Sequence, residues 1–221
     1  MNQQSTRFFN RIRIASAQYE TLLNEMSVLF GVNAGVFELG NTDIEVVPAD
    51  PESLGERTAV VGGLTVHTKS HSIPADCRGL DIQLAEHSPV DVVRIDSSQP
   101  GIQSVDHVVL RTAEAEDCIR LFRDDLGMRL ALDQTVEEWG GRMLFFREGA
   151  MTLEVAENGG KRPPKDFFWG ICYRCGDIES TRANLVSRGV SMTEVREGRK
   201  PGTRVATFKS HVGGIPSLLI E

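Results

Sequence analysis

An internal repeat constrains the fold of this chain more than any other feature of its sequence. The segment RIRIASAQYETLLNEMSVLFG at 11–31 aligns without gaps with HVVLRTAEAEDCIRLFRDDLG at 107–127. Each segment predicts a short strand followed by an amphipathic helix, because apolar residues recur at i, i+3, i+4 and i+7. Each ends in a glycine, Gly31 or Gly127, where the end of a helix favours a positive φ. We therefore expect two halves of similar architecture.

Two further matches extend the repeat. FELGNTDIEVV at 37–47 aligns with FREGAMTLEVA at 146–156, and each predicts two strands joined by a glycine-containing turn. The offset between the two copies is larger here than in the first match, so we expect an insertion in the second copy, around DQTVEEWGG. A weaker match joins CRGLDIQLAE at 77–86 to VGGIPSLLIE at 212–221.

A finer repeat divides the second half. Two strand–helix segments, which begin at SVDHVVL and WGICYRC, are each followed by turn-separated runs that favour strands. The repeating unit is therefore βαβββ. Four such units are expected, at 8–47, 58–86, 104–156 and 168–221. The second unit is too short for a helix and two further strands, because only a short run rich in Ser, Pro and His separates LTVHT from GLDIQLAE.

Composition excludes several other classes of protein. The chain has 221 residues, of which 40% are hydrophobic, and a net charge of −7. These values are typical of a globular protein that can bury its own core, and the acidic balance disfavours nucleic acid as a partner. No apolar run approaches the roughly 18 residues of a membrane span, and the N-terminus lacks the apolar segment of a secretion signal. We therefore expect a cytoplasmic protein with no membrane partner.

Four cysteines are expected to be reduced thiols in that compartment. Cys172 and Cys175 form a CxxC, a spacing found in zinc and redox sites. They fall in the aromatic run FFWGICYRC, which predicts a strand, where positions three apart face opposite sides. No second CxxC completes a zinc site, so a structural role is favoured for both thiols.

The ordered combination of SVDHVVLRTAEAEDCIRLFRDDLGMRL, MTLEVAEN and GDIESTRANLVSRGV resembles the vicinal oxygen chelate superfamily. This superfamily includes glyoxalase I, methylmalonyl-CoA epimerase, extradiol dioxygenases and bleomycin-resistance proteins. The resemblance implies an α+β fold of two glyoxalase-like halves, built from βαβββ modules that form cupped mixed β-sheets. The N-terminal half, at 1–90, is expected to be degenerate. A linker at 91–103 leads to the second half at 104–221.

In that superfamily, metal ligands come from the first and last strands of each module. The resemblance places these positions at His107 and Glu154 in the third module, and at Gly170 and Leu218 in the fourth. Only His107 and Glu154 can donate to a metal, and a catalytic metal usually has three protein ligands. The resemblance therefore implies an incomplete site for a divalent metal (Fe, Mn, Ni or Zn), which His211 or a second chain could complete.

His107 and Glu154 are also the candidate catalytic residues. An unperturbed histidine titrates near neutral pH, so His107 can act as an acid or a base; alternatively, it is a hydrogen-bonded residue inherited from a metal-binding ancestor. Glu154 interrupts an apolar strand. If it faces the cleft, desolvation raises its pKa and makes it a general base. If it faces solvent, it is an ordinary alternating strand position.

In the first half, the four equivalent positions fall on Arg11, Glu45, Gly63 and Gln83. An arginine does not bind a metal. Arg11 is therefore expected either to hold a carboxylate, from Glu45 or from a substrate, or to be an ordinary paired arginine. We assign Arg11, Glu45 and Gln83 to substrate binding, together with Trp169 and Tyr173 of the aromatic run.

Two classes of function follow from the resemblance. The first is an enzyme, namely a lyase, isomerase or ring-cleaving dioxygenase that acts on a small apolar or acyl substrate in a barrel cleft. The second is a metal-free protein that binds or sequesters a small molecule, as bleomycin-resistance proteins do. A homodimer is expected in either case. Convergence of His107 and Glu154 within chelating distance would favour the enzyme.

Overall fold

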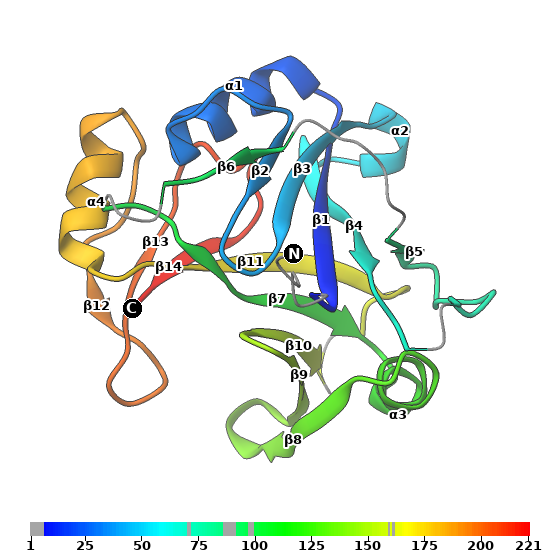
Figure 1. Cartoon of the computed structure of the whole chain (residues 1–221). Coiled ribbons are helices and arrows are strands. Elements are labelled where there is room, and N and C mark those ends of the chain that lie inside the picture. The colour runs from blue at the N-terminus through cyan, green and yellow to red at the C-terminus, as the bar shows by residue number, and fades with distance from the viewer. Residues whose placement is uncertain (1–6, 70–71, 86–91, 97–99, 159, 161) are drawn as a thin grey trace, which may run out of the picture.

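The computed structural model describes the chain except for residues 1–6, 70–71, 86–91, 97–99, 159 and 161. The described residues form two mixed β-sheets, each accompanied by its own helices (Figure 1). Strands of the first sheet come from 9–94 and strands of the second from 104–220. This arrangement confirms the expected α+β fold of two glyoxalase-like halves.

The first sheet has six strands in the order β5-β4-β1-β3-β2-β6. Its half of the chain contains β1 (Phe9–Ser16), α1 (Tyr19–Phe30), β2 (Val36–Glu38), β3 (Asp43–Pro48), α2 (Pro51–Leu54), β4 (Ala59–Val66), β5 (Asp81–Leu84) and β6 (Val93–Arg94). β1 lies parallel to β3 and antiparallel to β4, and β4 lies parallel to β5. The first strands of the two modules, β1 and β4, therefore lie side by side.

The second sheet has eight strands in the order β12-β13-β14-β11-β7-β10-β9-β8. Its first module contains β7 (Ser104–Thr112), α3 (Ala115–Ile119) with a π-helical continuation (Arg120–Asp125), β8 (Arg129–Val136), a 3₁₀ turn (Glu137–Trp139), β9 (Gly141–Glu148) and β10 (Met151–Glu157). Its second contains β11 (Phe167–Arg174), α4 (Ile178–Ser187), β12 (Arg196–Glu197), β13 (Arg204–Thr207) and β14 (Ser217–Ile220). β7 is parallel to β10 and antiparallel to β11, which repeats the centre of the first sheet.

Strand registers confirm the internal repeat. Arg11 pairs with Asp43 between β1 and β3, and His107 pairs with Thr152 between β7 and β10. The sequence alignment equates Arg11 with His107 and Asp43 with Thr152, so both pairs join positions that match in the two halves. Equivalent residues therefore occupy equivalent places in the two sheets.

The N-terminal half is reduced in two places. The first module, predicted as βαβββ over 8–47, has one strand fewer, because it has no counterpart of β8. The insertion around DQTVEEWGG forms the end of β8 and the 3₁₀ turn that follows it. The second module runs from β4 to β5 with no helix among its described residues, as predicted. The expected linker at 91–103 contains β6, which extends the first sheet by pairing with β2.

Local sequence explains where α1 ends and where α4 begins. Gly31 takes φ of 74° after α1 and donates its N–H to the carbonyl of Ser27, as expected for a left-handed helix end. Asp177 begins α4, because its side chain accepts a hydrogen bond from the N–H of Ser180 at 2.9 Å.

One apolar core joins the two halves. Tyr173 of β11 lies between Phe30 of α1 and Phe208, with ring centroids 6.1 and 6.0 Å away. Asn41, in the turn between β2 and β3, exchanges hydrogen bonds of 2.7 and 3.0 Å with the backbone of Val105. Because the core occupies one face of each sheet, the opposite faces are left to carry polar side chains.

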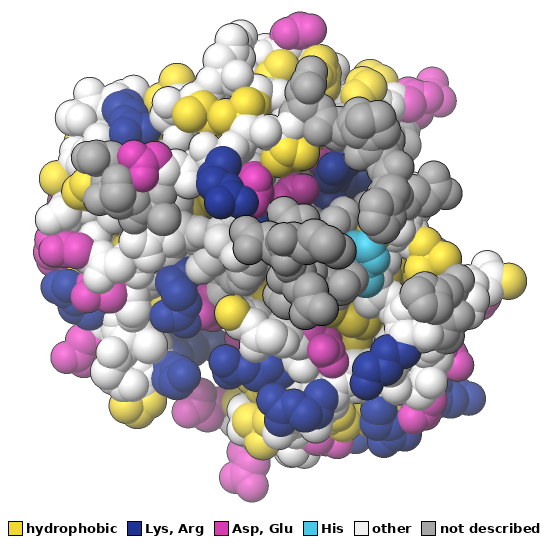
Figure 2. Space-filling model, in the orientation of Figure 1, with side chains coloured by type: hydrophobic (Ala, Val, Ile, Leu, Met, Phe, Trp, Pro, Cys, Tyr) yellow, Lys and Arg dark blue, Asp and Glu magenta, His cyan; other side chains and the backbone are white. Residues whose placement is uncertain are grey.

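All four cysteines are buried and free, as expected for reduced thiols. Among the described residues, no helix combines the length and apolar character needed to cross a membrane. Figure 2 shows acidic and basic side chains interspersed over one face of the molecule.

Candidate functional site

The central strands of the second sheet turn polar side chains away from the core. Val108 of β7 and Leu153 of β10 are fully buried in the core, whereas His107 and Glu154 point to the opposite face. Their side chains are 15% and 23% exposed, and His107 Nδ1 lies 3.6 Å from Glu154 Oε1. The structure thus brings together the two residues that the sequence proposed as a pair.

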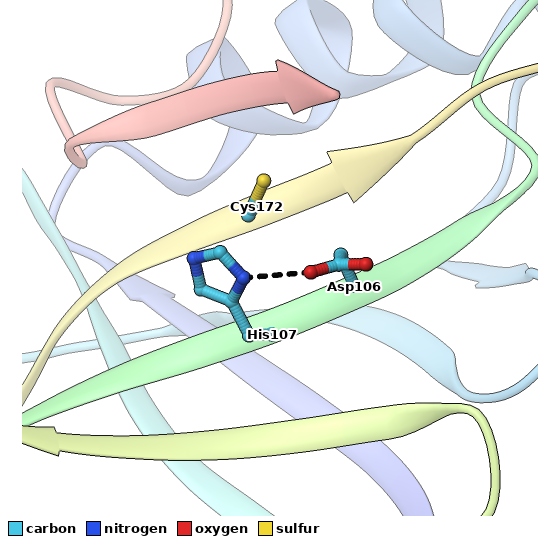
Figure 3. Close-up of side chains that lie close together, drawn as sticks. All are labelled: Asp106, His107 and Cys172. Carbon is cyan, nitrogen blue, oxygen red and sulfur yellow. Dashed lines mark hydrogen bonds and ion pairs between the residues drawn. The ribbon is translucent and has the colours of Figure 1, made fainter. Parts of the chain in front are cut away.

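A β-bulge turns Asp106 to the same side as His107. Cys172 pairs with His107 and Tyr173 pairs with Val105, so Asp106 is an extra residue on β7. A bulge re-aims the side chains around it. As a result, Asp106 Oδ1 lies 2.8 Å from His107 Nδ1 although the two residues are adjacent in the chain (Figure 3).

Two residues of β11 complete this group. Arg174 forms an ion pair with Asp106. Cys172 lies directly opposite His107 on the neighbouring strand, with 1% of its surface exposed (Figure 3). We call Asp106, His107, Glu154 and Cys172 the C-terminal cluster.

The environment shifts the pKa of each acidic member of the C-terminal cluster. Burial pushes the pKa of Asp106 upward, but hydrogen bonds from His107 and Arg174 outweigh it and lower the pKa to about 2. Burial raises the pKa of Glu154, and the charge of Asp106 raises it further against the opposing effect of His107. Burial also raises the pKa of the Cys172 thiol, as do Asp106 and Glu154. Ionised Asp106 can only accept, so His107 Nδ1 carries the hydrogen and Nε2 is the free nitrogen.

The C-terminal cluster fits a divalent metal. One donor atom from each of Asp106, His107 and Cys172 lies within 4.8 Å of the other two. Ligands of one metal ion, each about 2.0–2.3 Å from it, lie at most about 4.6 Å apart, so only small movements of these side chains would bring them to one ion. A cation beside Glu154 would oppose the burial and the Asp106 charge that raise the pKa of Glu154.

The fourth module supplies no donor at the two positions expected from the sequence. A Cβ atom at Gly170 would lie 2.4 Å from the carbonyl oxygen of Pro216, so this position has no room for a side chain. Leu218 of β14 is apolar and pairs with Cys172. The donor from β11 is instead Cys172, two residues after Gly170.

The N-terminal sheet gathers a second group of predicted residues. Arg11, Glu45 and Gln83 line one cavity of about 530 Å³. Arg11 Nη1 donates to Glu45 Oε2 at 3.2 Å, so the ion pair considered from the sequence is present. Gln83 Nε2 donates to Asp81 Oδ1 at 3.0 Å.

The remaining predicted residues lie elsewhere. Trp169 is the extra residue of a bulge on β11; it is 43% exposed and lines a separate cavity of about 170 Å³. Tyr173 is in the core between the halves, with 1% of its surface exposed. His211 takes φ of 62° in the loop before β14 and lies 2.7 Å from Ser210 Oγ. The structure brings none of the three into the C-terminal cluster.

Comparison with known families agrees with this architecture. Residues 106–207 match the family model described as Glyoxalase/Bleomycin resistance protein/Dioxygenase superfamily. This family model covers most of the C-terminal half. The match confirms the resemblance drawn from the sequence motifs. None of the proteins with curated functions matches the chain.

Solved structures extend the likeness to both halves. A mutant of 4-hydroxymandelate synthase from Streptomyces coelicolor is 13% identical, with a TM-score of 0.68 over 97% of this chain and 92% of that chain. At this identity the match shows the fold alone. Methylmalonyl-CoA epimerase from Mycobacterium tuberculosis is 20% identical, with a TM-score of 0.45 over 54% of this chain and 88% of that chain.

Sequence reasoning missed Asp106, Cys172 and Arg174. It compared equivalent positions of the modules and so looked at Gly170, whereas Cys172 reaches His107 as its cross-strand neighbour. A pairing diagram of β7 with β11 would have indicated Cys172. Asp106 had no comparable signal, because its orientation depends on a bulge that the alternation of side chains does not reveal.

Proposed function

We propose that this protein is a metal-assisted isomerase or lyase that transfers a proton at a carbon next to a carbonyl group of a small apolar or acyl molecule. The observation that supports it most is the convergence of Asp106, His107, Glu154 and Cys172 on one face of the second sheet. In this proposal Asp106, His107 and Cys172 hold the metal. Glu154, expected from the sequence as a ligand, is assigned the proton transfer. A homodimer and a cytoplasmic location remain part of the proposal.

The types of donor atom limit which metal ions suit the C-terminal cluster. Thiol sulfur and imidazole nitrogen suit Zn²⁺, Fe²⁺ and Ni²⁺, whereas Mn²⁺ prefers oxygen ligands. A metal bound there would withdraw charge from two neighbouring oxygens of the substrate. Non-haem iron oxygenases use two histidines and one carboxylate, whereas the C-terminal cluster has one histidine. Its donors therefore favour proton transfer over oxygen chemistry.

The protein's own residues have distinct tasks in this scheme. Arg174 keeps Asp106 ionised, and Asp106 holds the His107 ring through Nδ1, the nitrogen whose hydrogen a metal ion shared with Asp106 would replace. Glu154 is desolvated between the side chains of β7 and β10, and its raised pKa makes the carboxylate a stronger base than an exposed one. The transferred proton moves between the substrate carbon and a Glu154 oxygen.

Metal content and proton exchange test this proposal together. We expect about one equivalent of metal per chain in protein purified without a chelator or histidine tag, lost in His107→Ala and Cys172→Ser. Glu154→Gln should keep the metal but lose exchange of substrate hydrogen with D₂O, followed by NMR on a panel of 2-hydroxyketones and acyl thioesters. His211→Ala and Cys77→Ser are the matched controls and should keep both properties.

The alternative function is a metal-free small-molecule binding protein. It is favoured by Gly170 and Leu218, which leave two of the four superfamily ligand positions without a donor. Protein that takes up no metal even in excess, and exchanges no hydrogen in any compound of the panel, would refute the enzyme and leave this alternative.

A further inference from the structure

The N-terminal half keeps an open cleft although its strand set is reduced. A cavity of about 530 Å³ is lined by residues of β1, β3, β4 and β5 and by Ile73. Arg11, Arg13, Glu45 and Gln83 supply its charged and amide groups, and Ile73 and Ile82 supply apolar surface. Cavities of this size with mixed lining are typical small-molecule sites.

Arg11 has donors that its protein partners do not use. Its one hydrogen bond among the described residues runs from Nη1 to Glu45 at 3.2 Å. Nη2 lies 3.8 Å from Asp43 Oδ2, beyond hydrogen-bond distance, and Nε is buried without a partner. A guanidinium group carries five N–H donors, of which four are on the two Nη atoms, so three Nη hydrogens of Arg11 have no hydrogen-bond acceptor among the described residues.

Arg13, in contrast, is held by the protein itself. Its guanidinium donates to Thr65 Oγ1 at 2.6 Å and to the Asp81 carbonyl at 3.2 Å, and Nη2 lies 2.7 Å from Asp81 Oδ2. Gly63 makes room for it, because a Cβ atom there would lie 2.3 Å from Arg13 Nη2. Arg13 therefore fixes the wall of the cavity, and Arg11 is the arginine that can contact a ligand.

Arg11 of the first half and His107 of the second half occupy equivalent positions. Arg11 occupies the place of His107, and Asn10 is the extra residue of a bulge on β1 just as Asp106 is on β7. The first half thus presents a fixed positive charge where the second presents a metal-type donor. Paired N–H groups of a guanidinium match the two oxygens of a carboxylate.

We propose that the N-terminal cleft binds a small monocarboxylate with an aliphatic body, independently of the C-terminal cluster. Arg11 binds the carboxylate, and Ile73 and Ile82 contact the aliphatic chain. Glu45 and Asp43 both lie within ion-pair distance of Arg11, so a singly charged head group suits the cleft better than phosphate.

Isothermal titration calorimetry with C4–C8 straight-chain carboxylates, their amides and inorganic phosphate tests the proposal. We expect one carboxylate per chain to bind wild-type protein, with no heat from the amides or phosphate. Arg11→Gln should weaken binding at least about tenfold, the effect of losing a charged hydrogen bond. Ile73→Trp should fill the cavity and abolish binding. His107→Ala should leave binding unchanged, which separates this cleft from the other.

Several outcomes would overturn the proposal. These are no binding of any carboxylate to wild-type protein, equal binding of the amides, unchanged affinity in Arg11→Gln, or loss of binding in His107→Ala. Circular dichroism identifies variants that fail to fold. If Arg11→Gln does not fold, Ile73→Trp decides: retained affinity in that variant excludes this cavity.

Discussion

Arg78 links the two halves through a buried ion pair, and removing it should destabilise the whole protein. Arg78 Nε lies 2.5 Å from Asp166 Oδ2, and Nη2 lies 3.4 Å from Asp166 Oδ1. Asp166, between β10 and β11, has a side chain only 2% exposed. Arg78 Nη1 also contacts Asp117 of α3 at 2.5 Å. One side chain of the first half therefore holds two carboxylates of the second.

The expected cost follows from the burial of Asp166. Removing one partner of a buried ion pair costs about 3–5 kcal/mol, because the remaining charge is left without compensation. Asp166 keeps its hydrogen bond from Thr112 Oγ1 at 2.8 Å, so we expect the lower end of that range, about 3 kcal/mol. The contact with Asp117 adds little, since that side chain is 35% exposed and is also paired with Arg120.

Arg78→Met is the appropriate substitution. The backbone of Arg78 has φ of 60°, and glycine would relieve that strain while it removed the ion pair. Methionine keeps the Cβ atom and most of the length, so the measured loss reports the charge. For a chain of this size, about 3 kcal/mol corresponds to a fall in Tm of about 6–12 °C.

Calorimetric and urea unfolding of Arg78→Met and Arg123→Met measure this effect. Arg123 pairs with Asp124 where both side chains are about half exposed, so its loss should barely change stability, because water screens this pair. Adding Asp166→Asn to Arg78→Met should recover at least half of the lost stability, because it removes the buried charge. Equal losses in the two single variants would refute the reasoning.

Two further predictions concern the second sheet. Gly170→Ala should destabilise the protein by about 1–3 kcal/mol in thermal unfolding, because its Cβ would meet the Pro216 carbonyl at 2.4 Å; Gly35→Ala, which has open space, should change stability by no more than about 0.5 kcal/mol. Burial raises the folded-state pKa of Glu154 above 4.5, its ordinary value. As pH rises through this raised pKa, ionisation of Glu154 lowers the free energy of unfolding. In urea unfolding of metal-free protein, Glu154→Gln should therefore be more stable than wild type at pH 8, with the difference disappearing below about pH 4; a difference that persists at low pH would contradict this.

The internal repeat made most of the topology predictable. The two aligned segments assign equivalent strands in the halves, and the observed pairs of Arg11 with Asp43 and His107 with Thr152 follow that assignment. The missing helix between β4 and β5 was also predictable, since too few residues remain for it. The absence of a first-module counterpart of β8 was not anticipated, because four βαβββ units were expected, and alternation in β8 is weak because most of its residues are exposed.

The composition of the candidate site was harder to predict, because bulges change which side chains share a face. Alternation alone puts Asp106 and His107 on opposite faces of β7, whereas the extra residue puts both beside Cys172. The same bulge recurs at Asn10 on β1, so it belongs to the repeated architecture and not to the chemistry of one half.

These shared bulges separate the contribution of the fold from that of the side chains. Both halves place a bulged residue and its neighbour on the central strand, facing away from the core. The second half fills those places with Asp106 and His107, which suit a metal and proton transfer. The first fills them with Asn10 and Arg11, which suit an anion. Two groups of side chains at equivalent places therefore have different chemistry, so a ligand found at one group does not predict the ligand of the other, and each must be tested with its own variants.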